Sequence, residues 1–427
     1  MDSRKGRSVV GLLLLVALAS GRAQGATLKS ESYTINQADC GKTIVMSGGP
    51  HIVTLPGPAG FKPACSISVC NGNANASGEH AVLLDGFPPP LFPRLYMQQC
   101  AGVVIASGAW AAASRPERFR PNFSPELYVD NHGDDKNDGL LSNALNDALA
   151  TPAQCFNIFQ NEYDLITRQP TCILTGGQVF KGGVRLVGPM VGTSVMHIDG
   201  KGGVATIRAE RSTGQSAMLL ADFAPYLITR NISYDCIGAA ADCTALFLHQ
   251  QTGVDLNTGT TLVGDRASQV GLLCDSLCKV NQGADGTSPL SISGTFGVGI
   301  SGALGSQFEL NMGIGVADNT TISSSLIWLR GGSSILLSGS LNAGTGVTVA
   351  EIFTLRTAST ACLAHIATAG KFGGARQYSV LNGAVLVNTS TVALPGSVPG
   401  FVALVGYAPG FAPDGAGGNT GVNAGGC

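Results

Sequence analysis

The chain has 427 residues and a formal net charge of −2, and only 12% of its residues are charged. This low charge excludes the strongly basic surface that nucleic-acid-binding proteins present. Its 59 glycines are nearly twice the usual share, while Pro is ordinary and no tripeptide period exists, which excludes both collagen and disorder. With 44% hydrophobic residues the chain can bury a large core. The abundance of Gly, Val, Ile, Ser and Thr, together with the low charge, predicts an all-β protein of many short strands and tight turns.

Residues 1–25 are typical of a secretory signal peptide. They begin with the basic segment MDSRKGR, continue with the apolar run SVVGLLLLVALAS, and offer cleavage positions near Ala19 or Gly25. The apolar run is shorter than the roughly 18 residues that would span a bilayer, and no later run is long enough. We therefore expect a secreted, periplasmic or cell-surface protein without a membrane span.

The cysteines agree with export, because their number is even and cysteines pair in oxidising compartments. Their clustering suggests local disulfides among Cys40, Cys65, Cys70 and Cys100, and between Cys155 and Cys172, Cys236 and Cys243, Cys274 and Cys278, and Cys362 and Cys427. The connectivity stays open at this stage. A zinc site at residues 274–278 is disfavoured, since no second Cys or His cluster completes four ligands.

The first folded part is expected at residues 27–112, as a small β module. Its segments alternate apolar and polar positions and end in Gly or Pro turns. Residues 113–125 contain Pro and charged residues without periodicity, so we interpret them as a linker and a domain boundary.

One amphipathic helix is predicted, over residues 151–166. Thr151 is the expected N-cap, Pro152 occupies the first helical position and Gln154 completes a capping box. Apolar side chains then recur three or four residues apart, at Phe156, Phe159, Tyr163 and Ile166.

From residue 172 onward, short apolar strands repeat at a long period. We expect successive strands to begin at Ile173, Val195, Met218, Leu246, Gly271, Gly297, Leu326, Ile352 and Tyr378. Gaps of roughly 22 to 29 residues are typical of a solenoid, whose units bury their apolar faces only by stacking. The pattern predicts a right-handed parallel β-helix over residues 126–400, followed by a Gly-rich tail at 401–427. A β-sandwich array is the alternative, and the predicted helix would cover the exposed strands at the end of the solenoid.

Several sequence motifs suggest a binding or catalytic site, but the residues around them exclude it. GVGISG at 297–302 satisfies a dinucleotide-binding pattern, but no amphipathic helix follows it. CGKT at 40–43 lacks the leading Gly of a phosphate-binding loop, because that position holds Asn36. The six histidines are too scattered to specify a catalytic triad, so no catalytic residue is assigned.

The acidic stretch YVDNHGDDKNDG, residues 128–139, invites a metal interpretation. An EF-hand with Gly139 at loop position six would place Lys136 at position three and Leu145 at position twelve, so that pattern fails. We instead expect the Asp and Asn side chains to bind nearby backbone amides, with Gly133 and Gly139 supplying positive φ. A structural calcium ion on Asp130, Asp135 and Asp138 is the alternative, and no other cofactor is expected.

Charged residues recur on the predicted turns and strands of consecutive coils. The candidates for binding a ligand along one lateral face are Asp199, Lys201, Asp222, Arg230, His249, Asp255 and Arg266. Equivalent positions in a β-helix stack at about 4.8 Å, so such residues are able to line one surface. The competing interpretation is that they are ordinary solvated turn residues.

The acidic stretch resembles the first segment of pectin-lyase-like β-helix proteins, which include bacterial secreted proteins and phage tail-fibre or tailspike proteins. The matching positions are Tyr128, Val129, Gly133, Asp135, Asn137, Asp138 and Gly139. The family's capping helix is only partly matched, because Phe156 and Gln160 are kept while Ile158 and Phe159 replace its Thr and Ile. The first module and residues 374–397 are similar to segments of the phage proteins.

This resemblance implies a β-helix with a non-catalytic N-terminal cap. The coils lack the acidic and His-containing motifs of the family's lyases and polygalacturonases. The Asp134–Asp135 pair matches one such motif, but it lies in the cap. We therefore expect an exported structural or glycan-binding protein whose partner is a polysaccharide or glycan surface. The alternatives are a polysaccharide lyase or glycoside hydrolase, and a homo-oligomeric fibre-like adhesin.

Overall fold

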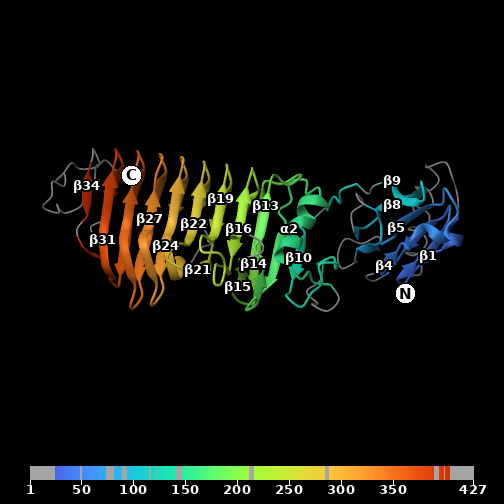
Figure 1. Cartoon of the computed structure of the whole chain (residues 1–427), viewed down its shortest axis with the longest axis horizontal. Helices are drawn as coiled ribbons and strands as arrows, with labels where there is room; N and C mark the ends of the chain where they lie inside the picture. Colours follow the sequence, from blue (N-terminus) through green and yellow to red (C-terminus); the bar gives the residue numbers. More distant parts are fainter. Residues whose placement is uncertain are drawn as a thin grey trace, which may run out of the picture. The chain divides into compact units, whose positions relative to one another are not determined.

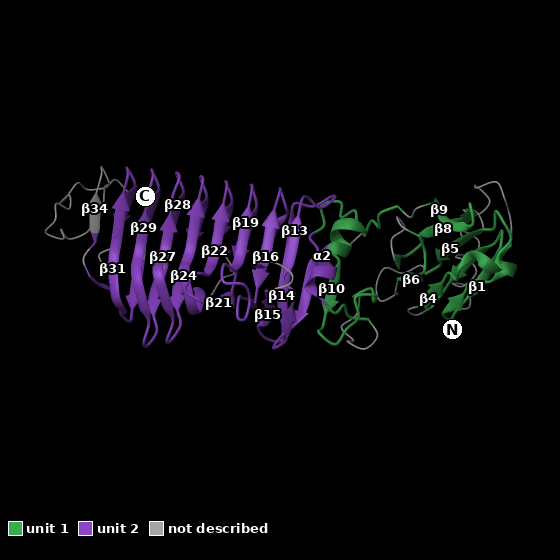
Figure 2. Cartoon of the chain, in the orientation of Figure 1, with its two compact units in different colours: residues 1–150, 157–168 green, residues 151–156, 169–427 purple. Residues whose placement is uncertain are grey.

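The computed structural model (Figure 1) describes residues 25–48, 51–73, 81–88, 94–114, 117–121, 123–140, 147–210, 216–283, 288–388, 394–398 and 400–403. They form two compact units (Figure 2). One unit contains the described residues up to 150 together with 157–168, and the other contains 151–156 and the described residues from 169 onward. The predicted signal peptide, apart from Gly25, and most of the predicted tail lie outside the described residues.

The first unit contains the small β domain that the sequence predicts. One sheet has the order β1 (Ala26–Lys29), β3 (Thr43–Met46), β5 (Ser66–Asn71), β8 (Cys100–Ala106) and β9 (Ala109–Ser114). The other has the order β2 (Tyr33–Thr34), β4 (His51–Thr54), β6 (Val82–Asp85) and β7 (Arg94–Leu95), and two short 3₁₀ helices are η1 (Gln37–Asp39) and η2 (Pro58–Gly60). Alternate residues such as Ile44, Met46 and Val53 point inward and are fully buried.

Two disulfides hold this domain, and they resolve the pairing that the sequence leaves open. Cys40 joins Cys65, and Cys70 joins Cys100. The second bond links residues that lie directly opposite each other on the antiparallel strands β5 and β8. The first unit continues with β10 (Glu126–Val129), which opens the acidic stretch.

The one α-helix among the described residues, α2 (Pro152–Asn161), is shorter than predicted. The Thr151 hydroxyl accepts a hydrogen bond from the Gln154 amide at 3.2 Å, which confirms the N-cap. The helix ends at Asn161 because the chain then bonds to another backbone segment, where the Asp164 amide donates to the Phe119 carbonyl at 2.9 Å. Ile166, predicted on the apolar stripe, is instead 50% exposed with φ +42°. Within the described ranges, no helix has the length and apolar character needed to cross a membrane.

The second unit is a parallel β-helix, as predicted, and each coil contributes to three parallel ladders. The first ladder contains β11 (Thr171–Thr175), β14 (Val195–Lys201), β17 (Tyr226–Arg230), β20 (Gly253–Leu256), β23 (Lys279–Asn281), β25 (Gln307–Leu310), the first parts of β28 (Ser334–Ala343) and β30 (Thr360–Ala369), and β32 (Val385–Asn388). The second contains β12 (Val179–Lys181), β15 (Ala205–Arg208), β18 (Ile232–Asp235), β21 (Thr261–Asp265), the first part of β24 (Leu290–Ala303), β26 (Gly313–Val316), and the later parts of β28 and β30.

The third ladder contains β13 (Val184–Val187), β16 (Ser216–Ala221), β19 (Thr244–His249), β22 (Val270–Asp275), the end of β24, β27 (Thr321–Leu329), β29 (Thr348–Leu355), β31 (Phe372–Leu381), β33 (Gly396–Val398) and β34 (Phe401–Ala403). In Figure 1 its strands lie side by side along the solenoid, from β13 to β31.

The register confirms the predicted period. Buried residues stack from coil to coil along the third ladder, in the order Met218, Leu246, Leu272, Ile300, Ile327, Phe353 and Tyr378. The predicted strand positions from Met218 to Tyr378 all fall on this ladder, whereas Ile173 and Val195 lie on the first ladder. The predicted strand positions fall on two different ladders because the inward-facing segments of both ladders are equally apolar.

From β16 onward, a stacked left-handed corner joins the third ladder of one coil to the first ladder of the next. Two consecutive residues with positive φ form each corner: Asp222 and Phe223, Gln250 and Gln251, Ser276 and Leu277, Leu304 and Gly305, Gly331 and Gly332, Thr357 and Ala358, and Asn382 and Gly383. Their amides bind carbonyls of the next coil, as Leu277 does to Leu304 at 3.1 Å. Glycine adopts this conformation without the steric cost that a Cβ imposes, and this accounts for part of the glycine content.

Three predicted local disulfides are confirmed in the second unit. They join Cys155 to Cys172, Cys236 to Cys243, and Cys274 to Cys278. The first of them ties the opening turn of α2 to β11. The predicted Cys362–Cys427 pair includes Cys427, which lies outside the described residues.

Candidate functional site

The outer face of the first ladder holds several of the predicted ligand-binding residues. Hydrogen bonds join polar side chains of successive coils on this face. Its strands alternate as the pleat requires, so that Leu227 and Thr229 of β17 point into the core while Tyr226 and Arg230 point outward. On β20, Asp255 is partly exposed between the buried Val254 and Leu256.

Tyr226 connects three successive coils on this face. Its hydroxyl donates to Asp255 Oδ1 at 2.6 Å and accepts from Asn281 Nδ2 at 2.9 Å. The ring lies across Gly253, where an added Cβ would collide with ring carbons of Tyr226. Glycine at this position therefore lets the tyrosine lie flat along the ladder and reach the next coil.

The register places further polar groups in line with Asp255. Asp255 is opposite Asn281, and Asn281 is opposite Glu309, so one row carries a carboxylate, an amide and a second carboxylate. Burial, followed by the hydrogen bond and charge of Asp255, raises the pKa of the Tyr226 phenol, with Glu309 adding to the shift. The tyrosine thus stays protonated and acts as a fixed donor. We refer to Tyr226, Asp255, Asn281 and Glu309 as the tyrosine surface.

A charged group adjoins the tyrosine surface on β14 and β17. Asp199 lies opposite Arg230 in the register, a favourable arrangement of opposite charges on neighbouring strands. His197 contacts Gln169 through Nε2 and Oε1 at 3.0 Å. Burial and the nearby Arg230 lower the pKa of the His197 imidazole, and Asp199 opposes that shift.

The predicted ligand-binding residues do not all share one face. Asp199, Lys201, Arg230 and Asp255 belong to the first ladder, with Lys201 at the end of β14. Asp222 sits in the left-handed corner with φ +53°, and His249 lies on the third ladder, 3.8 Å from Asp275. The expectation of a single lateral face is therefore wrong for these two and for Arg266. A coil has three ladders, and proximity in the linear sequence does not reveal which of them a residue occupies.

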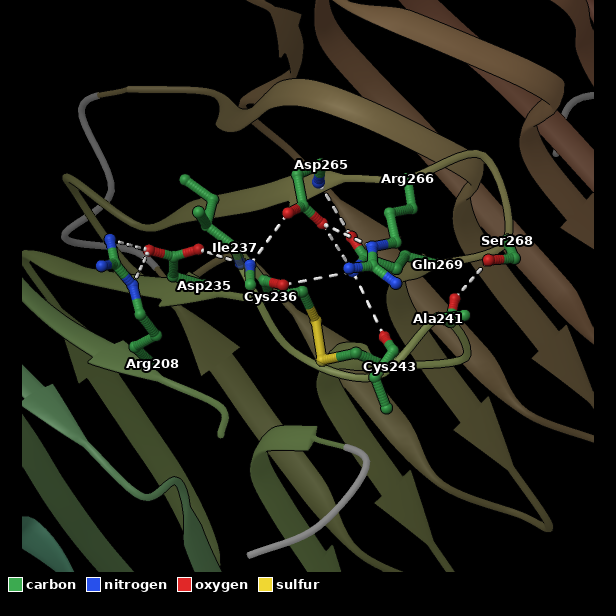
Figure 3. Close-up of a disulfide and its surroundings, with 12 residues drawn as sticks. Arg208, Asp235, Cys236, Ile237, Ala241, Cys243, Asp265, Arg266, Ser268 and Gln269 are labelled. Carbon is green, nitrogen blue, oxygen red and sulfur yellow. Dashed lines mark hydrogen bonds and ion pairs between the residues drawn. A yellow bond between two sulfur atoms is a disulfide. The ribbon is translucent and has the colours of Figure 1, made fainter. Parts of the chain in front are cut away.

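Arg266 belongs to the surroundings of the Cys236–Cys243 disulfide (Figure 3). Its Nε is 3.7 Å from Asp265 Oδ1. Gln269, which is fully buried, donates through Nε2 to the Cys236 carbonyl at 3.1 Å and to Asp265 Oδ1 at 2.9 Å. Asp265 also accepts from the Gly238 amide at 2.8 Å. These bonds hold the disulfide loop to the next coil, which is a structural role.

A partly buried ion pair flanks the same loop in Figure 3. Arg208 Nη2 lies 2.6 Å from Asp235 Oδ2, and the Asp235 side chain is 3% exposed. Asp235 Oδ1 accepts from the Ile237 amide at 2.6 Å. Because the carboxylate already has these partners, Asp235 serves the loop rather than an open binding surface.

The acidic stretch behaves as the structural interpretation predicts. Asp135 accepts from the Ala150 amide at 2.9 Å, and Asp138 accepts from the Ala81 and Leu140 amides at 2.8 and 2.9 Å. Asp130 accepts from the His132 amide at 3.0 Å. The described residues contain no cluster of three His, Cys, Asp or Glu side chains placed to hold a metal, and calcium on Asp130, Asp135 and Asp138 stays a prediction.

One detail of that interpretation is wrong. Gly139 has positive φ, as expected, at +74°. Gly133 does not; it is needed because a Cβ there would collide with the carbonyls of Ala148 and Leu149. The close approach of two backbone segments therefore explains this glycine.

Sequence reasoning missed four residues of this face: His197, Tyr226, Asn281 and Glu309. The signal was present in part, because YLITR and the next coil's GVDL are strand-like segments in which alternate residues face outward, and the outward residues include Tyr226, Arg230 and Asp255. Only the register between the two coils shows that Tyr226 lies over Gly253.

The chain matches no protein-family model and no curated protein. Among solved structures it is similar to the crystal structure of Escherichia coli ybhC, at 10% sequence identity and a TM-score of 0.34, over 69% of this chain and 80% of that one.

Proposed function

We propose that this chain is an exported β-helix protein of the pectin-lyase-like type that binds a glycan through the tyrosine surface without cleaving it. The disulfides support an oxidising compartment, and the signal-like residues 1–25 support export. The resemblance of the acidic stretch to the family's cap supports the family assignment.

The bridge from Tyr226 to Asp255 and Asn281 carries the proposal. Hydroxyl, carboxylate and amide groups lie on a rigid row whose strands repeat at about 4.8 Å, a spacing suited to the hydroxyls of an extended sugar chain. Because the three side chains already bind one another, they lose little freedom when a ligand arrives. The adjacent Asp199 and Arg230 extend the same face with charged groups.

Hydrolysis is the second candidate function, favoured by the shared row of Asp255 and Glu309. Two strand spacings separate these residues, about 10 Å along the ladder. Inverting glycoside hydrolases hold their two carboxyl groups roughly 6.5–9.5 Å apart, with water between them. Against this, Asp255 already accepts a short hydrogen bond from Tyr226.

Affinity electrophoresis in gels containing neutral or acidic polysaccharides tests the binding proposal. The unmodified protein should be retarded by at least one of them, and Tyr226→Phe and Asp255→Asn should each weaken binding about tenfold, the worth of a lost hydrogen bond to a charged group. His249→Gln, on the third ladder, is the matched control and should bind normally. New reducing ends that disappear in both Asp255→Asn and Glu309→Gln would instead establish hydrolysis.

A further inference from the structure

A second outward-facing group lies on the third ladder, around Trp328. The register places Trp328 of β27 between Ser301 and Thr354 of the neighbouring coils. Both neighbours are small and buried, at 7% and 5% exposure, whereas the indole is partly exposed. The ring is therefore the largest outward side chain among these three stacked positions.

Two arginines border the indole on successive coils. Arg330 and Arg356 follow Leu329 and Leu355, which are register partners, so the two arginines occupy equivalent positions about one strand spacing of 4.8 Å apart. Their guanidinium carbons lie 5.5 and 5.9 Å from the indole centroid, within the range of cation–π attraction. Both side chains are exposed.

Neither guanidinium has an acidic partner in the part of the chain that the structure describes. The acid on this stretch of the ladder, Glu351, lies opposite Arg376, with which it forms a 3.9 Å ion pair, and it also accepts from the Ser379 hydroxyl at 2.9 Å. Arg330 and Arg356 thus stack as two like charges, an arrangement that destabilises a sheet unless an anion offsets it.

The geometry points to a binding site here for a sugar ring that carries a sulfate or phosphate monoester. Two guanidinium groups one coil apart suit an anion with three free oxygens that bridges both of them, whereas a carboxylate has two oxygens that a single guanidinium engages. The apolar face of Trp328 offers a surface against which the ring packs. This site lies on a different ladder from the tyrosine surface, and it does not depend on the function proposed there.

Binding of the exported protein to dextran sulfate, phosphomannan, polygalacturonate and unmodified dextran tests the site. Dextran sulfate or phosphomannan should bind about tenfold more tightly than polygalacturonate, while dextran should not bind here, and the affinity should fall as salt rises. Comparison of the first two polymers identifies which monoester is preferred.

Variants at exposed positions test whether Arg330 and Arg356 form the binding site. Arg330→Gln and Arg356→Gln should each weaken binding of the preferred polymer about tenfold, and the double variant about a hundredfold, because each loses charge-assisted hydrogen bonds. The matched control is Arg185→Gln, which removes an exposed arginine from the same ladder in an early coil and should bind normally. Circular dichroism verifies that each variant is folded.

Three results would overturn the proposal. One is polygalacturonate binding as tightly as both sulfated and phosphorylated polymers. Another is a double Gln variant that binds as well as the Arg185→Gln control. The third is unchanged affinity when Arg330→Lys is combined with Arg356→Lys, because that variant keeps both charges but loses the planar guanidinium groups that the site requires.

Discussion

Arg94 donates a hydrogen bond from Nη1 to Glu162 Oε1 at 3.1 Å, and both side chains are almost completely buried, at 1% and 3% exposure. The Tyr96 hydroxyl donates to the other carboxylate oxygen at 2.8 Å. Arg94 Nε also donates to the Asn137 carbonyl at 2.8 Å, so the guanidinium connects β7 to the acidic stretch. A buried charge pair is tolerated only when such additional hydrogen bonds satisfy it.

Arg94→Met should destabilise the protein strongly, because it leaves the Glu162 carboxylate buried without its cation. Removal of one member of a buried pair costs about 3–5 kcal/mol of unfolding free energy. Urea denaturation followed by circular dichroism measures the change. Arg120→Met is the control, since Arg120 is 65% exposed in its pair with Asp164 and should change stability by less than about 1 kcal/mol. Equal effects of the two variants would contradict this account of Arg94.

Gly253→Ala should displace Tyr226 and break its hydrogen bond to Asp255. The added methyl group collides with the tyrosine ring, and overpacking of this kind costs about 1–3 kcal/mol. The midpoint temperature of thermal denaturation should therefore fall, and polysaccharide binding should weaken. At Gly315, on the second ladder, a Cβ would meet Pro289 at an ordinary 3.4 Å, so Gly315→Ala should leave both properties close to normal. An undisturbed Gly253→Ala protein would show that Tyr226 has another resting position.

His197 should titrate below the ordinary imidazole value of 6.5, because burial and Arg230 disfavour its charged form. Since the folded pKa lies below the unfolded one, the contribution of the neutral ring to stability is present above pH 6.5 and is lost as the pH falls through the folded pKa. NMR titration of the ring protons measures the midpoint. Arg230→Gln should raise it, and Asp199→Asn should lower it further; shifts of the opposite sign would disprove the assigned causes.

Gln269→Leu should loosen the Cys236–Cys243 loop without touching the disulfide. The variant removes the amide that binds the Cys236 carbonyl and Asp265, leaving buried polar groups unsatisfied at a cost of about 1–3 kcal/mol. Hydrogen exchange at the amides of residues 237–240 should quicken. Ser268→Ala, which removes only an exposed hydroxyl contact to the Ala241 carbonyl, should leave that exchange almost unchanged.

Local features of the chain could be predicted because they depend on neighbouring residues. The Thr151 cap acts on an amide three residues away, and the confirmed cysteine pairs of the solenoid are separated by 4 to 17 residues. The end of α2 could not be predicted, because it is decided by Phe119, a residue far from the helix in sequence.

By itself, the amino-acid sequence determined the all-β class, the long repeat and the local disulfides of this protein, because strand alternation and loop closure act over short stretches of chain. Tertiary structure alone decided which residues meet. The register of three coils brings Tyr226, Asp255 and Asn281 together. The register of two coils brings Arg356 next to Trp328 and Arg330. Coil lengths vary by a few residues, and a shift of one residue in a strand turns every side chain to the opposite face, so the binding surfaces follow from the stacked backbone.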